Sequence, residues 1–195
     1  MRRYWYFAST LTSFPFGAPP PLSVEEFDVL CSRFVDQGDL VLVRHVDVVR
    51  RGEYSACIEK SSFLKGYFEW ERGVRNALVV LRARAHKWDA GQWTRPGSVG
   101  SDALQSAQAV SAASDPLQVE LTFEHERWNA VERLISLSAF ELDSILAYKM
   151  KLLIATRCAS FDRERGKEGF RTLYQDIVDA AAEAASSALD TGVAT

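Results

Sequence analysis

Few side chains in this sequence have the types and spacing that chemistry requires. The three histidines, His45, His86 and His125, are far apart along the chain, and none lies in a nucleophile motif. A carboxylate-bridged metal pair on helices needs Glu-x-x-His, but Thr122 stands three residues before His125. We therefore interpret the histidines as solvated or helix-capping residues, and the sequence predicts neither a metal site nor a cofactor.

A phosphate-binding loop of the Walker type is not found either. Such a loop needs glycines that free backbone N–H groups, followed by a lysine and a hydroxyl that binds the metal. Here Glu168 follows Gly166 and Lys167, and Phe161 stands where the first glycine would be. With no catalytic residue in view, we predict that the protein is not an enzyme.

Asp143 is a charged residue in apolar surroundings. It lies inside the apolar arc of the long segment 139–161, where a carboxylate must be paired or functional. Arg75 and Arg82 are one heptad apart, beside the apolar stripe of another long helix. We therefore predict that Asp143 is buried and forms a structural pair with at least one of these arginines. An acid catalyst is the alternative, but no second polar group converges on Asp143 from its own helix.

A candidate interface is the basic face of the helix that carries these arginines. Arg72 and Lys87 lie opposite its apolar stripe, where they are either solvated or bind an acidic protein surface. Trp93 lies in the following loop beside Arg95 and is assigned to the same candidate interface. The other tryptophans considered lie on apolar stripes and are predicted to be in the core: Trp70, Trp88 and Trp128.

Hydrophobic periodicity predicts an all-α fold, an elongated bundle whose main helices span about 62–89, 115–137 and 139–161. The glycines at 66 and 73 weaken the first of these helices or allow another helix to pack closely on it. Shorter helices are predicted at 23–36, after the capping box Ser23 and Glu26, at 101–114, and from Phe170 onward after a charged turn at Gly166. The segment 40–49 is rich in β-branched residues, which fit a helix or a strand, and we favour a helix because no second strand is evident to pair with it.

The N-terminal segment is predicted to be an extended arm. Four aromatic residues, Tyr4 to Phe7, precede a stretch rich in Phe, Pro and Gly that ends at Pro21. Aromatic residues favour strands and prolines restrict the backbone, so an extended arm or short strand followed by a rigid turn is expected. We expect this arm to lie on the helical core.

Length and charge limit the remaining possibilities. A chain of 195 residues is long enough for one substantial core, and we predict a single domain over 1–185 with a flexible acidic and Ala-rich tail over 186–195. The net charge of −3 argues against broad binding to nucleic acid or to anionic lipid. No apolar run approaches the roughly 18 residues of a membrane span, so no membrane insertion is predicted. The odd number of cysteines, without C-x-x-C spacing, suits a reducing cytoplasm: Cys31, Cys57 and Cys158.

Several stretches together resemble a known pattern. They are YWYF, PPPLSVEEF, RGVRNALVVLRA, DPLQVE, ERWNAVERL and FELDSILAYKMKLLIATRCASFD, and they cover most of residues 4–170. They are similar to an uncharacterised bacterial family whose genes accompany those of V/A-type ATPase subunits, notably in spirochaetes. The strongest parts are helical patterns rather than catalytic signatures.

The resemblance implies a non-catalytic part of a rotary ATPase. Its expected fold and place are those of the helical, funnel-shaped subunit that lies between the membrane rotor ring and the central shaft, which is called C, or d in eukaryotes. The implied partners are the central-stalk and rotor-ring subunits, and the implied location is cytoplasmic, peripheral to the inner membrane through a protein partner. A chain of this length is short for the whole funnel, so it either replaces the funnel-shaped subunit or accompanies it as an assembly protein. The alternative is a free-standing helical enzyme with a carboxylate and arginine pocket.

Overall fold

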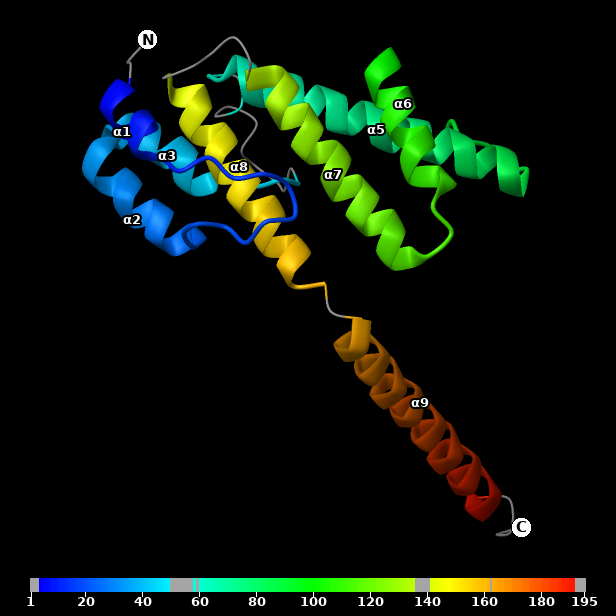
Figure 1. The fold of residues 1–195 in the computed structure, drawn as a ribbon. Helices are drawn as coiled ribbons and strands as arrows, with labels where there is room; N and C mark the ends of the chain where they lie inside the picture. The colour runs from blue at the N-terminus through cyan, green and yellow to red at the C-terminus, as the bar shows by residue number, and fades with distance from the viewer. Residues whose placement is uncertain (1–3, 50–57, 59, 136–140, 162, 192–195) are drawn as a thin grey trace. The chain divides into compact units, whose positions relative to one another are not determined.

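The computed structural model describes residues 4–49, 58, 60–135, 141–161 and 163–191, without the side chains of 163–165 and 182–191. Every regular element formed by these residues is a helix, which confirms the predicted all-α class (Figure 1). The helices are α1 (Trp5–Thr10), α2 (Val24–Phe34), α3 (Gln37–His45), α5 (Ser62–His86), α6 (Ser101–Ala112), α7 (Pro116–Ile135), α8 (Leu142–Ala159) and α9 (Arg163–Thr191).

The chain forms two compact units, Met1–Ala159 and Ser160–Thr195. The single domain predicted over 1–185 extends past this boundary, and the predicted tail begins inside α9. The turn expected around Gly166 is wrong, because α9 already starts at Arg163. Glu, Lys and Arg, which flank this glycine in the sequence, are good helix formers and carry the helix through it.

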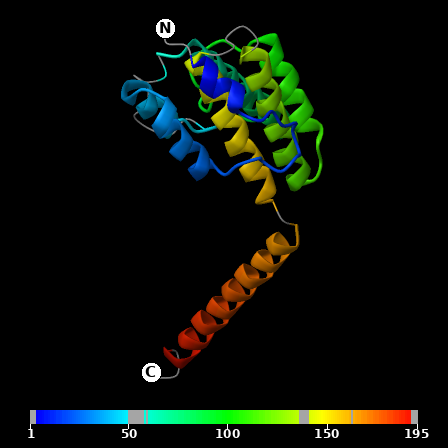
Figure 2. The ribbon, with the colours of Figure 1, turned by 60° about the vertical axis from the view of Figure 1, so that its left-hand side comes forward.

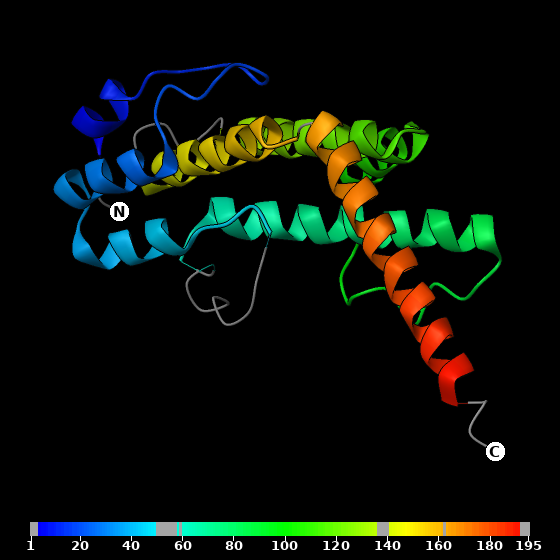
Figure 3. The ribbon, with the colours of Figure 1, turned by 90° about the horizontal axis from the view of Figure 1, so that it is seen from below.

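In the first unit, α8 lies between α2 and α7 (Figures 1 and 2). Figure 3 shows a second layer, in which α5 runs beneath α8 and α3 continues that layer. The large apolar side chains of α8 confirm that this helix is central, since Ile145, Met150 and Ile154 are each 0% exposed. The predicted limits at 137 and 139 lie outside the described residues.

The glycines of α5 do allow close helix packing. A Cβ atom at Gly66 would lie 3.2 Å from a side-chain carbon of Leu134 in α7, and one at Gly73 would lie 3.0 Å from the Cβ of Ala103 in α6. These positions are seven residues apart, so they lie on one side of the helix. Both neighbouring helices therefore approach the backbone of α5 closely.

The N-terminal segment differs from the predicted extended arm at its start, where residues 5–10 form α1. The hydroxyl groups of Ser9 and Thr10 each donate to a carbonyl one turn back, at 2.8 Å, and satisfy helical backbone acceptors. Phe7 stacks on Phe27 and Phe34 of α2, so packing on α2 favours the helical form over a strand.

Residues 11–23 lie on the core, as predicted. The segment crosses α8 on the side away from α5 (Figures 1 and 3). Phe14 contacts the rings of Trp128 and Tyr148 edge-on, and Tyr148 donates from its hydroxyl to the Thr12 carbonyl at 3.0 Å. The segment ends at the predicted capping box, in which the Glu26 N–H donates to Ser23 Oγ at 3.1 Å and the Ser23 N–H donates to Glu26 Oε2 at 2.8 Å.

Asp143 is buried, 1% exposed, as predicted, but its predicted arginine partner is wrong. Its Oδ1 accepts from the Ser61 hydroxyl at 2.6 Å, and its Oδ2 accepts from the Ser62 hydroxyl at 3.2 Å and the Phe63 N–H at 3.3 Å. These donors surround the N-terminus of α5, where unpaired N–H groups and the helix dipole favour a negative charge. The carboxylate therefore caps α5 from the first turn of α8.

This contact predicts how Asp143 contributes to stability. Asp143→Ala leaves buried donors unpaired and should lower the free energy of unfolding by about 1–3 kcal/mol, measured by urea titration. Asp143→Asn keeps an acceptor and should cost less. In double-mutant cycles, Asp143→Ala with Ser61→Ala should show coupling of about 0.5–3 kcal/mol, whereas Asp143→Ala with Arg75→Met should be additive. A coupling energy between Asp143 and Arg75 would instead support the arginine pair that the sequence predicted.

Candidate functional site

A buried ionic network joins α5 to α7. Arg127 of α7 is 2% exposed, and it donates from one terminal nitrogen to Glu124 Oε1 at 2.5 Å and from the other to Glu71 Oε1 at 3.2 Å. Glu71 lies on α5 and Glu124 on α7, and both are buried. Arg75 donates to Glu71 at 2.7 Å, and Arg157 of α8 forms an ion pair with Glu124 at 2.8 Å. Each buried carboxylate is therefore shared by two guanidinium groups.

Helical spacing places these groups, although sequence analysis did not identify the network. Glu71 and Arg75 are four residues apart, and Glu124 and Arg127 three apart, so each pair shares a helix face. Glu71 also lies three residues before Val74, which is 0% exposed. The sequence did contain a signal for the network, because α5 and α7 each carry a carboxylate on the apolar face of a long helix.

Burial and neighbouring charges act in opposite directions on the pKa values of the network. Burial raises the pKa of the Glu124 carboxyl, while Arg127 and Arg157 act to lower it. Burial acts to lower the pKa of Arg127, yet the neighbouring Tyr67, Glu124 and Glu71 raise it overall. Arg127 therefore stays positively charged inside the protein at neutral pH.

Beside the network lies a pocket of about 460 Å³, which we call the arginine pocket. It is formed by α5, α6, α7, the end of α8 and the loop that follows α5. Its lining comprises Arg75, Asn76, Leu78, Val79, Arg82, Trp93, Arg95, Val110, Val119, Glu120, Phe123, Arg127 and Arg157. All of these residues belong to the first unit.

Positive charge exceeds negative charge in this pocket. Three of its arginines, Arg75, Arg127 and Arg157, are paired with Glu71, Glu124 or Glu120. The guanidinium groups of the other two arginines of the lining, Arg82 and Arg95, form no ion pair with any described residue. Five arginines face three carboxylates, and the difference, 5 − 3 = 2, leaves two positive charges for an anion.

The loop that carries Arg95 is held against α5 at two points. Asn76 is buried, and its side chain donates to the Arg95 carbonyl at 2.7 Å and accepts from the Arg95 N–H at 2.9 Å. Gly97 has φ +140°, and a Cβ there would lie 2.7 Å from Nε of Arg72. The loop backbone therefore has little freedom at these two points.

The three residues of the predicted interface occupy different surroundings. Arg72 is half-buried against Gly97, while Lys87 is an exposed residue in the left-handed conformation at the end of α5. Fifteen residues of helix separate them by about 22 Å. Trp93 is 66% exposed and contacts Trp88 edge-on. The interface itself stays a prediction.

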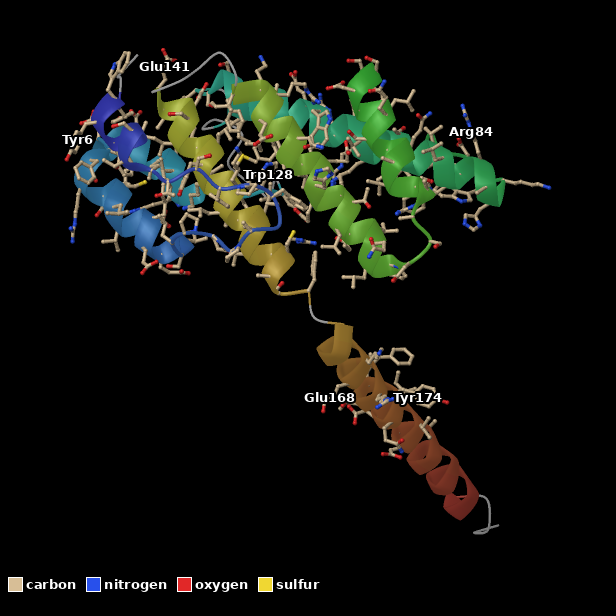
Figure 4. All side chains as sticks on the ribbon, viewed as in Figure 1. Tyr6, Arg84, Trp128, Glu141, Glu168 and Tyr174 are labelled. Atoms are coloured by element: carbon tan, nitrogen blue, oxygen red, sulfur yellow. The ribbon has the colours of Figure 1, made fainter. Side chains whose placement is uncertain are left out.

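Two of the predicted core tryptophans are confirmed, since Trp70 and Trp128 are 6% and 2% exposed. Trp128 lies within the bundle in Figure 4, which labels it. Trp88 is 40% exposed, and the prediction for it is wrong because α5 ends at His86, before the apolar stripe reaches this residue.

Of the predicted structural pair, Arg75 and Arg82 line the arginine pocket and Asp143 does not. The contributions of Arg95, Arg127 and Arg157 were missed, because they come from a loop and two other helices. All three histidines are exposed, as expected for solvated groups. The described residues contain no group of three metal-binding side chains.

One protein-family comparison gives a match. Residues 101–181 match the family described as "Protein of unknown function (DUF2764)", which is less than half of the chain. The matched region contains α6, α7 and α8 and the first part of α9, and with them Glu124, Arg127 and Arg157 of the network. No curated protein and no solved structure matches the chain.

The network predicts a pH-dependent effect of removing its central arginine. Arg127→Met leaves two buried carboxylates without their shared partner and should lower the free energy of unfolding by about 3–5 kcal/mol at pH 7. Burial then raises the pKa of Glu124 without opposition from Arg127, so the folded state binds protons that the unfolded state releases. Stability of this variant should therefore rise as pH falls from 7 toward the unfolded value of about 4.5.

Urea unfolding of the variant across this pH range measures the effect. Glu124→Gln in the Arg127→Met background removes the titrating group and should flatten the pH dependence between pH 7 and 5. If the stability of Arg127→Met does not rise between pH 7 and pH 5, the assignment is contradicted.

Proposed function

We propose that the protein is a non-catalytic helical subunit, or an accessory or assembly protein, of a V/A-type rotary ATPase. It binds at the junction of the central stalk and the membrane rotor ring. The resemblance of several helical stretches to the family encoded with these ATPases supports the choice of partner. The observation that carries the proposal is the exposed apolar face of α9.

This face consists of large side chains at helical spacing. Phe170, Leu173, Tyr174, Ile177 and Val178 are between 41% and 68% exposed. They occupy one broad stripe, because residues three, four, seven and eight apart share a helix face. Figure 4 shows Tyr174 and Glu168 projecting from opposite sides of α9.

A helical partner suits this stripe. Contiguous exposed apolar surface on a protein marks an interaction site, and a helix presenting it binds another helix or a groove. Phe170, Leu173, Ile177 and Ala180 follow the a and d positions of a heptad, the pattern by which helices pair. We therefore propose that the apolar stripe of α9 binds a helix of an ATPase stalk subunit. The competing partner for this stripe is a second copy of this chain.

On this proposal, the protein is linked to the membrane through its partner. No described helix has the length and apolar character needed to span a bilayer. On this proposal the protein binds on the cytoplasmic side, and contact with the membrane is made by the rotor ring rather than by this chain.

The enzyme alternative has one observation in its favour, which is the arginine pocket. However, Glu71 and Glu124 accept from arginines, and Glu120 is bonded to Arg157 at 3.2 Å. A general base needs a carboxylate that is available to a substrate proton, so these pairings favour binding over turnover.

The proposal predicts that substitutions in the α9 stripe prevent complex formation. Leu173→Glu with Ile177→Glu places charges in the apolar contact and should abolish co-purification with the co-expressed stalk and rotor-ring subunits. The matched control, Thr172→Glu with Gln175→Glu, adds the same charge on the opposite face and should retain the complex.

Three results would overturn the proposal. They are failure of the unsubstituted chain to co-purify with either group of subunits, equal loss in the control, and nucleotide hydrolysis by the purified chain. Light scattering measures the mass of the chain alone and so tests whether a second copy of the chain binds α9. A dimer broken by the stripe substitutions alone would assign α9 to self-association and remove the observation on which the proposal rests.

A further inference from the structure

We propose that the arginine pocket is a binding site for an elongated organic polyanion of the nucleoside triphosphate class, which the protein binds without hydrolysing. The inference rests on the first unit alone and is independent of α9 and of any partner. It needs no Walker loop, because guanidinium groups bind phosphate through paired N–H donors rather than through loop backbone.

The first argument is the surplus of positive charge. The only carboxylate in the described lining of the pocket is that of Glu120, and Arg157 donates to it at 3.2 Å. The side chains of Arg82 and Arg95 carry charges that no described acidic group neutralises. A polyanion would supply the missing negative charge.

The second argument is that the pocket has a buried cationic wall. Arg127 is 2% exposed, and its Nε is buried without a hydrogen-bond partner among the described residues. Its guanidinium carbon lies 4.0 Å from the centre of the Phe123 ring, so the group also contacts an aromatic face. An arginine fixed in this way differs from a solvated surface lysine, because its orientation is set before an anion binds.

The spacing of the arginines selects an extended ligand. Arg75 and Arg82 are seven residues apart on α5, which separates their backbone positions by about 10 Å along the helix. Arg95 approaches from the loop and Arg157 from α8. A chain of phosphates with an organic group can contact more of these guanidinium groups at once than a single inorganic phosphate can.

Size and lining favour an organic group on that ligand. The volume of about 460 Å³ lies within the usual range of small-molecule sites, about 300–1,000 Å³. Apolar side chains form the rest of the wall, among them Leu78, Val79 and Phe123, and Trp93 lies at the loop. Aromatic and aliphatic surfaces of this kind accept a base or another ring.

The test is a titration of the full chain by calorimetry with ATP, tripolyphosphate, inorganic phosphate and adenosine. ATP should bind most tightly, tripolyphosphate more weakly, and phosphate and adenosine at least tenfold more weakly than ATP. Affinity for ATP should fall with added salt, because exposed charges are screened. ATP should remain intact during the titration.

A pair of double variants separates the pocket from general electrostatics. Arg82→Met with Arg95→Met removes two pocket charges and should weaken ATP binding at least tenfold. Arg84→Met with Lys87→Met removes two charges from exposed residues at the same end of α5 (Figure 4 labels Arg84) and should change affinity less than twofold. Melting temperatures show whether each variant is folded. If the first double variant misfolds, Arg82→Met alone takes its place, with Arg84→Met as the control.

The proposal fails if no polyphosphate binds at millimolar concentration, or if both double variants lose affinity equally. It also fails if adenosine binds as tightly as ATP. Tighter binding of tripolyphosphate than of ATP would remove the organic group from the proposed ligand and contradict the assignment to a nucleotide.

Discussion

The buried charge of Arg127 is the constraint on which the rest of the first unit depends. An isolated guanidinium inside a protein is costly, so Glu71 must approach from α5 and Glu124 from the preceding turn of α7. Arg157 then fixes the end of α8 to the same carboxylate. The relative positions of three helices are therefore set by one set of polar contacts, which tolerates less variation than apolar packing does.

The central helix α8 is held by polar contacts at other points along its length as well. Asp143 caps the N-terminus of α5, and Lys149 is buried and forms an ion pair with Asp28 of α2 at 2.7 Å. Tyr148 binds the Thr12 carbonyl of the segment that crosses the helix. Apolar burial supplies most of the stabilisation, while these directional contacts select one rotation and one register of α8 among its neighbours.

Hydrophobic periodicity was sufficient to predict the long helices α5, α7 and α8 and the burial of Asp143, and the spacing of Ser23 and Glu26 was sufficient to predict the capping box before α2. It was not sufficient to predict the partner of Asp143, because Ser61 and Ser62 face it only after α5 and α8 have packed together. The arginine pocket was out of reach for a similar reason, since Arg95 is placed by the bonds of a loop to Asn76. Helix α1 was missed because local aromatic content favours a strand, and only packing on α2 overrides that preference.

The absence of a side chain at Gly73 ties the backbone of α5 to the shape of the pocket. Ala103 lies against this glycine, and Val110, further along the same helix α6, lines the pocket. The loop with Arg95 leads directly into α6. A larger residue at position 73 would separate α6 from α5 and displace that wall without altering a single charge. A substitution at this one position would therefore change the width of the arginine pocket while every arginine of its lining is retained.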